Sequence, residues 1–291
     1  MYLSHLMIEV GSDPDRPRPG RLWLRNMYHV HQRLCMAFLP PDSKKKKDDP
    51  EFLKPFSPDD FPETRHIADQ KPEAVGVEAL KHVHRQRDSE SGFLFRVDPL
   101  PGASVAILVL SAAQPDWDYA FHNAGYLLAA PPSEPRRLKV SIVPGAHFHF
   151  RLTANPVRKV TGKSRNAKGE SFDEKWIGKH VPVPADEASL RDWLERRAEP
   201  RWSAARNSED KQHPPGFRLI EITGIETGYV YFNKTRDAAK GQRLRSARYE
   251  GILEVTNPDH FRETLIRGIG PAKAFGFGLL SVASTKRTED L

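Results

Sequence analysis

The sequence predicts an α+β fold made of two tandem ferredoxin-like domains. Strand-like and helix-like segments are mixed along the chain without strict alternation, which favours α+β packing. The 291 residues suit one large domain or two small ones. A proline-rich joint at 131–135 separates two halves that each have the pattern of a small β–α–β unit. We therefore place an N-terminal domain at 1–143 and a C-terminal domain at 144–291.

The N-terminal half begins with a strand and then a helix. Apolar residues are frequent over Tyr2–Val10 and a turn-rich segment follows them, which predicts a strand. A helix is expected over Arg21–Leu39, because apolar residues recur there with helical spacing. Pro40 and Pro41 end it, since proline lacks the backbone N–H that a helix needs. The predicted core-facing stripe consists of Trp23, Met27, Val30, Leu34 and Phe38.

Residues 40–92 have a different composition, with a run of lysines, several prolines and scattered acids. This pattern is typical of a long surface insertion within the N-terminal domain. Two segments rich in β-branched and aromatic residues follow at 92–97 and 104–112, and we expect them to be strands.

The C-terminal half repeats these kinds of element. We expect a strand pair, a basic hairpin or loop pair, a helix, two strands, a second helix and a glycine-rich closing segment. The strand pair is expected at 138–143 and 147–154, the hairpin or loop pair at 157–180 and the first helix at 185–199. The two later strands are expected at 220–232 and 248–255, the second helix at 259–266 and the glycine-rich segment at 268–282.

The charge distribution points to a polyanionic partner. The chain has a net charge of +7, but residues 1–135 carry 16 basic and 19 acidic side chains while residues 136–291 carry 29 and 19. Within the second half, 136–179 holds 11 bases against 3 acids and 234–248 holds 6 against 1. Concentrated positive charge on an otherwise balanced chain favours nucleic-acid binding over a merely solvated surface.

Several other classes are excluded. Cys35 is the only cysteine, so a disulfide framework or a multi-cysteine metal site is ruled out and a reducing cytoplasm is expected. No apolar run is long enough to predict a membrane span. Gly162-Lys163-Ser164 does not complete a phosphate-binding P-loop, because Val157 occupies the position of its first glycine. Three His-x-His pairs lack a third ligand nearby, so we expect neither a metal nor a cofactor.

The predicted helix at 21–39 also carries a candidate acid–base pair. At about 100° per residue, Tyr28 and His31 share one flank at the edge of the apolar stripe, and His29 points to the opposite side. A half-buried histidine beside a tyrosine suits proton transfer. A structural histidine at the boundary between core and solvent remains the alternative.

Four phrases of the sequence resemble the CasE family of CRISPR-associated endoribonucleases from type I-E systems. They are Tyr-x-x-His at 28–31, GFLFRVDPL at 92–100, RLTANPVRK at 151–159, and RYEGILEV at 248–255 with LIRGIGPAKAFGFGLLSVA at 265–283. The resemblance covers about two thirds of the chain. It implies tandem ferredoxin-like domains, metal-independent cleavage of the repeat hairpin in precursor CRISPR RNA, and retention of the product as a subunit of the Cascade complex.

The resemblance also implies the roles of the helix residues. His31 matches the catalytic histidine of the family and Tyr28 its helical partner. The reaction would be attack by an RNA 2′-hydroxyl on the adjacent phosphate, which leaves a 2′,3′-cyclic phosphate and a 5′-hydroxyl and needs no cofactor. Met36 stands in the region where some relatives have a lysine, so a stabilising cation has to come from elsewhere, from Arg33 or from a basic residue of the C-terminal domain.

RNA contacts are expected from the basic stretch and from the glycine-rich segment, because phosphate contacts supply affinity and glycine lets backbone N–H groups approach phosphates. Packing turns are the alternative for single glycines. The predicted RNA-binding residues are Arg151, Asn155, Arg158, Lys159, Lys163, Arg165, Lys168, Gly268, Gly270, Lys273, Gly276 and Gly278. The expected partners are the CRISPR repeat RNA hairpin and other Cascade subunits, with no membrane. A non-catalytic RNA-binding scaffold of the same fold is the alternative function.

Overall fold

The structure is a computed structural model of the chain, and it describes residues 1–11, 19–38, 92–101, 104–138, 142–166, 169–198, 215–232 and 242–285. The predicted insertion at 40–92 lies outside the described residues except for Gly92. The chain divides into two compact units. Unit 1 comprises Met1–Val140, Val230–Arg243 and Lys273–Gly276, and unit 2 comprises Ser141–Tyr229, Leu244–Ala272 and Phe277–Leu291. The domain boundaries expected from the sequence stay predictions.

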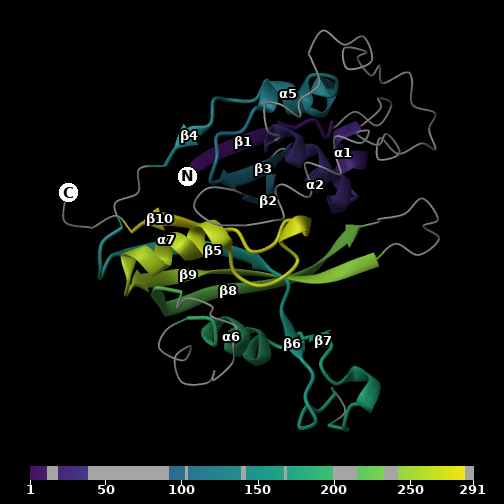
Figure 1. The fold of residues 1–291 in the computed structure, drawn as a ribbon, viewed down its shortest axis with the longest axis vertical. Coiled ribbons are helices and arrows are strands. Elements are labelled where there is room, and N and C mark those ends of the chain that lie inside the picture. The colour runs from purple at the N-terminus through teal and green to yellow at the C-terminus, as the bar shows by residue number, and fades with distance from the viewer. Residues whose placement is uncertain are drawn as a thin grey trace. The chain divides into compact units, whose positions relative to one another are not determined.

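Unit 1 contains one antiparallel sheet with the strand order β2-β3-β1-β4 (Figure 1). Its helices come between β1 and β2 and between β3 and β4. In chain order the elements are β1 (Tyr2–Ile8), α1 (Pro19–Leu24), α2 (Met27–Cys35), η1 (Met36–Phe38), β2 (Phe93–Leu100), β3 (Ser104–Ser111), α5 (Trp117–Phe121), η5 (Gly125–Leu127) and β4 (Arg136–Arg137).

Unit 2 contains a second sheet with the strand order β10-β5-β9-β8, together with a two-stranded ribbon, β6-β7. In chain order its elements are β5 (His147–Ala154), β6 (Val157–Lys159), η6 (Glu174–Trp176), β7 (His180–Pro182), α6 (Glu187–Glu195), β8 (Phe217–Phe232), β9 (Gln242–Val255), α7 (Pro258–Arg267) and β10 (Leu280–Ser284). The last residues of β8 and the first of β9 are counted in unit 1, as is the short helix η7 (Lys273–Phe275).

Each sheet places its first strand between the fourth and the third, with the second strand at the far edge. Leaving out the small ribbon, each also follows the order strand, helix, two strands, helix, strand. This is the ferredoxin-like arrangement, so the prediction of two such folds in tandem is confirmed.

The core of unit 1 lies between α2 and one face of its sheet. The helical stripe predicted from the sequence is buried throughout, from Trp23 to Phe38. It packs against side chains that alternate along the strands, since every second residue of a strand points to the same face. These strand residues are Leu6, Ile8, Phe93, Phe95, Ile107 and Val109.

In unit 2 both helices pack on the same face of the sheet. Trp193 of α6 stacks on Tyr249 of β9, with ring centroids 6.0 Å apart. Phe261 of α7 contacts Phe148 of β5 at 6.3 Å and Phe217 of β8 at 5.9 Å. Burial of these aromatic side chains supplies a large share of the hydrophobic stabilisation.

The single helix predicted over 21–39 is two helices followed by a 3-10 turn. The break falls at Asn26, whose side-chain oxygen accepts a hydrogen bond from the backbone N–H of Tyr28 at 3.1 Å and so caps α2. Asparagine favours this N-cap position over a helix interior, because its side chain competes for backbone hydrogen bonds. The apolar spacing continues across the break, which is why periodicity alone did not reveal it.

The strand predicted over 138–143 is wrong in its described part. Residues 138, 142 and 143 lie outside any strand, and the strand is instead Arg136–Arg137, opposite Tyr2 and Leu3. Ile142 is buried as a single apolar side chain. Pro144 and the turn residue Gly145, with a φ of +79°, then lead into β5.

Candidate functional site

His31 lies in the core of unit 1. Its side chain is 1% exposed, and its ring stacks on Phe95 with a centroid distance of 6.2 Å and an angle of 14°. Phe93 contacts the same ring at 5.4 Å, and Cys35 Sγ lies 3.6 Å from its Nε2. The expected half-buried position is therefore wrong, because two aromatic rings of β2 and a thiol one turn later in α2 enclose this flank of the helix.

Tyr28 is half-buried one turn before His31. Its ring centroid lies 6.1 Å from that of His29. The Nε2 of His29 is 3.4 Å from the side-chain nitrogen of Asn26, the residue that caps α2. Tyr28 and His29 therefore lie near the start of the helix, and the proposed cooperation of Tyr28 with His31 stays a prediction.

Part of the glycine-rich segment belongs with these residues. The helix η7, which contains the predicted RNA-binding residue Lys273, contacts both α2 and β2. Gly276 follows it with a φ of +81°, and a Cβ atom there would lie 3.3 Å from Cε2 of Phe95. Phe95 in turn stacks on His31. The closing segment thus packs against the ring that stacks on the candidate histidine, a contact that its sequence did not indicate.

Arg33, the cation suggested from the sequence, is a core residue. Its Nη1 donates to the backbone oxygen of Ala120 at 3.2 Å and to Oδ1 of Asn123 at 3.0 Å. Burial lowers the pKa of its guanidinium, partly opposed by Tyr126, and burial raises the pKa of Tyr126 to about 12. Arg33 therefore ties α2 to the α5 region, and in this structure its charge does not face solvent.

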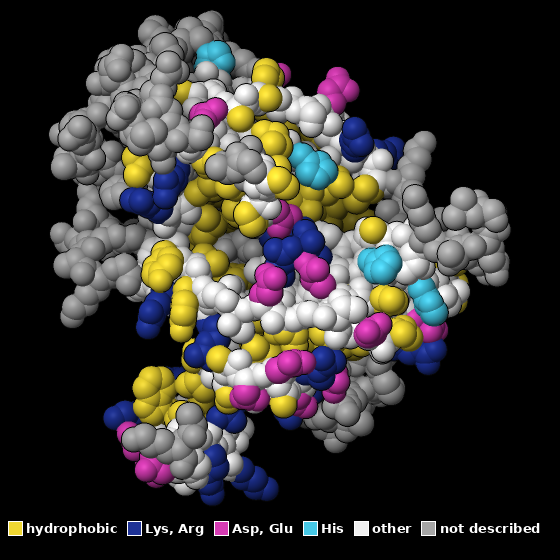
Figure 2. All heavy atoms as spheres, turned by 180° about the vertical axis from the view of Figure 1, so that it is seen from behind, with side chains coloured by type: hydrophobic (Ala, Val, Ile, Leu, Met, Phe, Trp, Pro, Cys, Tyr) yellow, Lys and Arg dark blue, Asp and Glu magenta, His cyan; other side chains and the backbone are white. Residues whose placement is uncertain are grey.

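The predicted basic hairpin is confirmed in unit 2. Strands β6 and β7 pair antiparallel, and a bridge between Arg165 and Ser171 continues the pairing into the connecting loops. We call residues 157–182 the basic hairpin. Figure 2 shows its dark-blue cationic side chains on the part that projects at the lower left.

The predicted cations of the basic hairpin differ in their surroundings. Lys159, Lys163 and Arg165 are exposed. Arg158 is half-buried, lies over the ring of Phe172 at 5.9 Å and donates to the backbone oxygen of Arg165. Lys168 lies outside the described residues.

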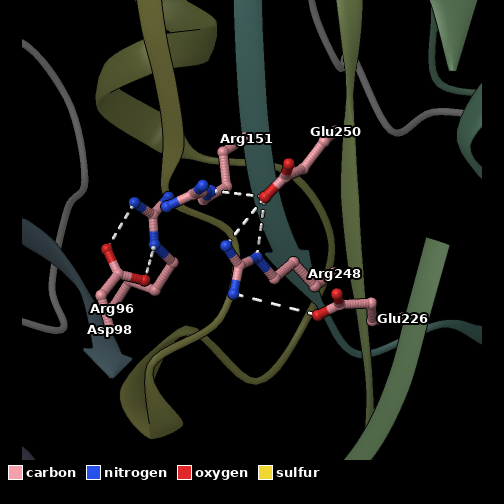
Figure 3. A network of polar contacts seen from close by, with 6 residues as sticks. All are labelled: Arg96, Asp98, Arg151, Glu226, Arg248 and Glu250. Carbon is pink, nitrogen blue, oxygen red and sulfur yellow. Dashed lines mark hydrogen bonds and ion pairs between the residues drawn. The ribbon is translucent and has the colours of Figure 1, made fainter. Parts of the chain in front are cut away.

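Arg151 and Asn155 connect β5 to β9. Arg151 Nε donates to Glu250 at 2.7 Å, and Arg248 bonds the same carboxylate and lies 3.9 Å from Glu226 (Figure 3). Burial alone would raise the pKa of Glu250, but the hydrogen bonds from Arg248 and Arg151 lower it. Asn155 is buried and donates to the backbone oxygen of Arg245 at 2.7 Å.

The sequence analysis named Arg151 and Asn155 but missed the ion pairs among the charged strand residues, although a signal for them was present. In unit 1, Arg96 forms a two-pronged ion pair with Asp98 at 2.7 Å, also drawn in Figure 3. Arg96 and Asp98 are two residues apart on β2, and Arg248 and Glu250 are two apart on β9. Opposite charges at this spacing share one face of a strand, so they could have been predicted to pair.

The remaining predicted glycines shape the turn after α7. Gly268 caps that helix with a φ of +71°, and Gly270 has a φ of +85°, where an added Cβ atom would lie 3.1 Å from the Trp193 ring. Gly278 donates to Thr153 and accepts from Ile269, at 2.8 and 2.9 Å. Each takes a backbone conformation that other residues rarely adopt.

The described residues contain no group of three or more His, Cys, Asp or Glu side chains that could hold a metal ion. No helix among them is long and apolar enough to cross a membrane.

Residues 77–284 match a family model described as CRISPR associated protein. The chain belongs to this CRISPR-associated family. The resemblance to CasE is confirmed by two curated relatives. The CRISPR-associated endoribonuclease Cse3 of Thermus thermophilus is 29% identical over 200 residues, which span 65% of this chain and 79% of that protein. The Cascade subunit CasE of Escherichia coli is 26% identical over 208 residues, 71% of this chain and 89% of that protein.

A solved structure of another CRISPR-associated protein has the same fold. It is Thermus thermophilus Cse3 bound to an RNA that represents a pre-cleavage complex, with a TM-score of 0.56 and 23% identity. The comparison covers 97% of this chain and 100% of that one.

Proposed function

We propose that this CRISPR-associated protein is an endoribonuclease that cuts the repeat hairpin of precursor CRISPR RNA and stays on the product as a Cascade subunit. The observation that carries the proposal is membership of a family whose curated members include an endoribonuclease and a Cascade subunit. The exposed cations of the basic hairpin support it independently, because they suit a phosphate backbone. A cytoplasmic location is part of the proposal and agrees with the single cysteine.

The reaction we propose is an internal phosphoryl transfer. The 2′-hydroxyl oxygen attacks the adjacent phosphorus as its proton is removed, and the bond from phosphorus to the 5′-oxygen breaks as that oxygen gains a proton. The products are a 2′,3′-cyclic phosphate and a 5′-hydroxyl, and the proton transfers balance without a metal or cofactor. We assign a proton transfer to His31 and the orientation of the hydroxyl or the phosphate to Tyr28.

The burial of His31 sets a condition on this mechanism. An imidazole that is 1% exposed cannot meet a phosphodiester in the described conformation. RNA binding therefore has to open one edge of the ring while Phe95 and Cys35 hold its orientation. Local opening of this kind is ordinary for active sites and costs less than global unfolding.

RNA affinity is assigned to the basic hairpin. Lys159, Lys163 and Arg165 present exposed charges on a ribbon fixed by backbone hydrogen bonds. A paired RNA stem is recognised mainly through its shape and backbone, and such a ribbon can follow one groove of it. Contacts of this kind give affinity and register, and the position of the cut then depends on the site in unit 1.

The direct test is cleavage of a labelled CRISPR repeat RNA from the genome that encodes this chain, performed in EDTA. A matched RNA carries deoxyribose at the nucleotide 5′ of the cut. Cleavage of the first RNA and not of the second is expected, because the second lacks the attacking hydroxyl. Tight binding of both without cleavage of either would replace the endoribonuclease with a non-catalytic RNA-binding subunit.

A further inference from the structure

The basic hairpin carries apolar surface that its own fold does not bury. Trp176 is 40% exposed and Ile177 is 50% exposed. The two large apolar side chains are neighbours on a small, highly charged ribbon. Such an exposed apolar surface indicates a site that is covered when a partner binds. The other described tryptophans, Trp23, Trp117 and Trp193, are all buried, so the exposure of Trp176 is a local feature.

Backbone hydrogen bonds hold Trp176 in place. Its N–H donates to the carbonyl of Asp173 at 2.9 Å, and its own carbonyl accepts from the N–H of Lys179 at 3.0 Å. Val160, on the other side of the hairpin, accepts from Gly178 at 2.9 Å and donates to Lys179 at 2.8 Å. Because both sides of the ribbon fix this turn, the indole is presented on an ordered support, and binding to it costs little further entropy.

The charge around the indole selects the kind of partner. The ammonium nitrogen of Lys179 lies over the Trp176 ring in a cation–π contact, 5.4 Å from its centroid. Lys159 and Lys163 add exposed positive charge on the same hairpin. A nucleotide matches this arrangement, since its base can stack on the indole while its phosphate meets the ammonium group. A purely apolar protein surface would leave these cations without a complement.

We propose that Trp176 is a stacking platform for an unpaired base of the RNA that the basic hairpin binds, with Lys179 placed to neutralise the phosphate of that nucleotide. This inference rests on the proposed function, because it takes RNA as the ligand of the hairpin. It adds a base contact to a surface whose other predicted contacts are to phosphates.

The test measures binding of the labelled repeat RNA to the full chain and to three variants. Trp176→Ala is expected to raise the dissociation constant about 5- to 100-fold, the usual effect of losing one stacked base. Trp176→Phe keeps an aromatic face and should stay within about threefold of the unchanged protein. Ile177→Ser is the matched control, because it removes exposed apolar surface of the same patch but no aromatic ring, and it should weaken binding less than Trp176→Ala does.

Two further readouts identify stacking. The salt dependence of binding should be unchanged in Trp176→Ala, because the indole carries no charge and releases no counterion. Repeat RNA should quench part of the tryptophan fluorescence of the unchanged protein, and Trp176→Phe should lose that part. RNAs in which one unpaired nucleotide at a time lacks its base then locate the stacked base. Loss of that base should weaken binding to the unchanged protein. It should not weaken binding to Trp176→Ala any further, because that variant has already lost the stacking contact.

Equal RNA affinity of the unchanged protein and Trp176→Ala would overturn the inference, and so would equal losses in Trp176→Ala and Ile177→Ser. Either result would leave the endoribonuclease proposal standing, provided that the unchanged protein binds and cuts the RNA. Failure of the unchanged protein to bind the repeat RNA would instead contradict the proposed function itself.

Discussion

Sγ of Cys35 lies 3.6 Å from Nε2 of His31, one helical turn earlier in α2. Both side chains are buried, and Phe95 stacks on the imidazole. The thiol and the aromatic ring together fix the direction in which the ring nitrogens point. We therefore expect Cys35, noted in the sequence only as a single cysteine, to help position the candidate catalytic histidine.

Replacing Cys35 should therefore slow cleavage without preventing RNA binding. We expect Cys35→Ala to reduce the single-turnover cleavage rate about 2- to 10-fold, the effect of losing one weak hydrogen bond. Cys35→Ser keeps a polar partner for Nε2 and should recover most of the rate. Rates measured over a pH series, alongside thermal unfolding, separate orientation of the ring from loss of stability. Two variants that cut as fast as the unchanged protein would remove Cys35 from the mechanism.

Gly276 should matter through the same aromatic ring. Its φ of +81° disfavours any side chain, and the methyl group of Gly276→Ala would press on Phe95 at 3.3 Å. We expect a loss of about 1–2 kcal/mol in stability, together with slower cleavage, because Phe95 contacts His31. Gly125→Ala is the control, since nothing lies within 4 Å of its added carbon. If Gly276→Ala retained full stability and cleavage, the packing chain from Gly276 to His31 would be of no consequence.

Arg33 is expected to act in folding and not in catalysis. Arg33→Ala removes the donor to Ala120 and Asn123 in a buried setting, which should cost about 2–4 kcal/mol of unfolding free energy. Chemical denaturation measures this loss. A variant with unchanged stability but greatly reduced cleavage would show that Arg33 is the stabilising cation after all.

The basic hairpin should dominate the salt dependence of RNA binding. Lys163 is exposed in the turn after β6, and Lys163→Ala should reduce the slope of log affinity against log salt by about 0.7–0.9 if Lys163 contacts one phosphate. Arg196→Ala provides a control of equal charge on α6, where Arg196 is paired with Asp192 at 2.7 Å. The same change of slope in both variants would mean that net charge, and not the hairpin, sets the affinity.

The sequence predicted the fold because hydrophobic periodicity determines which faces are buried. The stripe from Trp23 to Phe38 is buried as the helical spacing predicted, and the strand predicted over 147–154 is β5. The break at Asn26 was hidden, because the apolar spacing runs through it and only the cap reveals it. The strand at Arg136–Arg137 was hidden too, since its pairing with β1 depends on a distant part of the chain.

The candidate site was less predictable, because burial depends on what packs against a helix from elsewhere in the chain. The helical wheel placed His31 at the edge of the stripe, but Phe93 and Phe95 come from β2 and extend the core over it. The charge of Arg33 suggested contact with a substrate, whereas its partners at Ala120 and Asn123 are about 90 residues away in sequence. Sequence alone carries no signal for such contacts.

The central claim is that His31 performs proton transfer, and one comparison tests it most directly. His31→Ala and His29→Ala are incubated in EDTA with labelled CRISPR repeat RNA, and single-turnover cleavage and binding are both measured. We expect His31→Ala to bind the RNA with little change in affinity and to cut it at least about 100-fold more slowly, while His29→Ala cuts at close to the unchanged rate. Normal cleavage by His31→Ala, or loss of cleavage in His29→Ala alone, would contradict the claim.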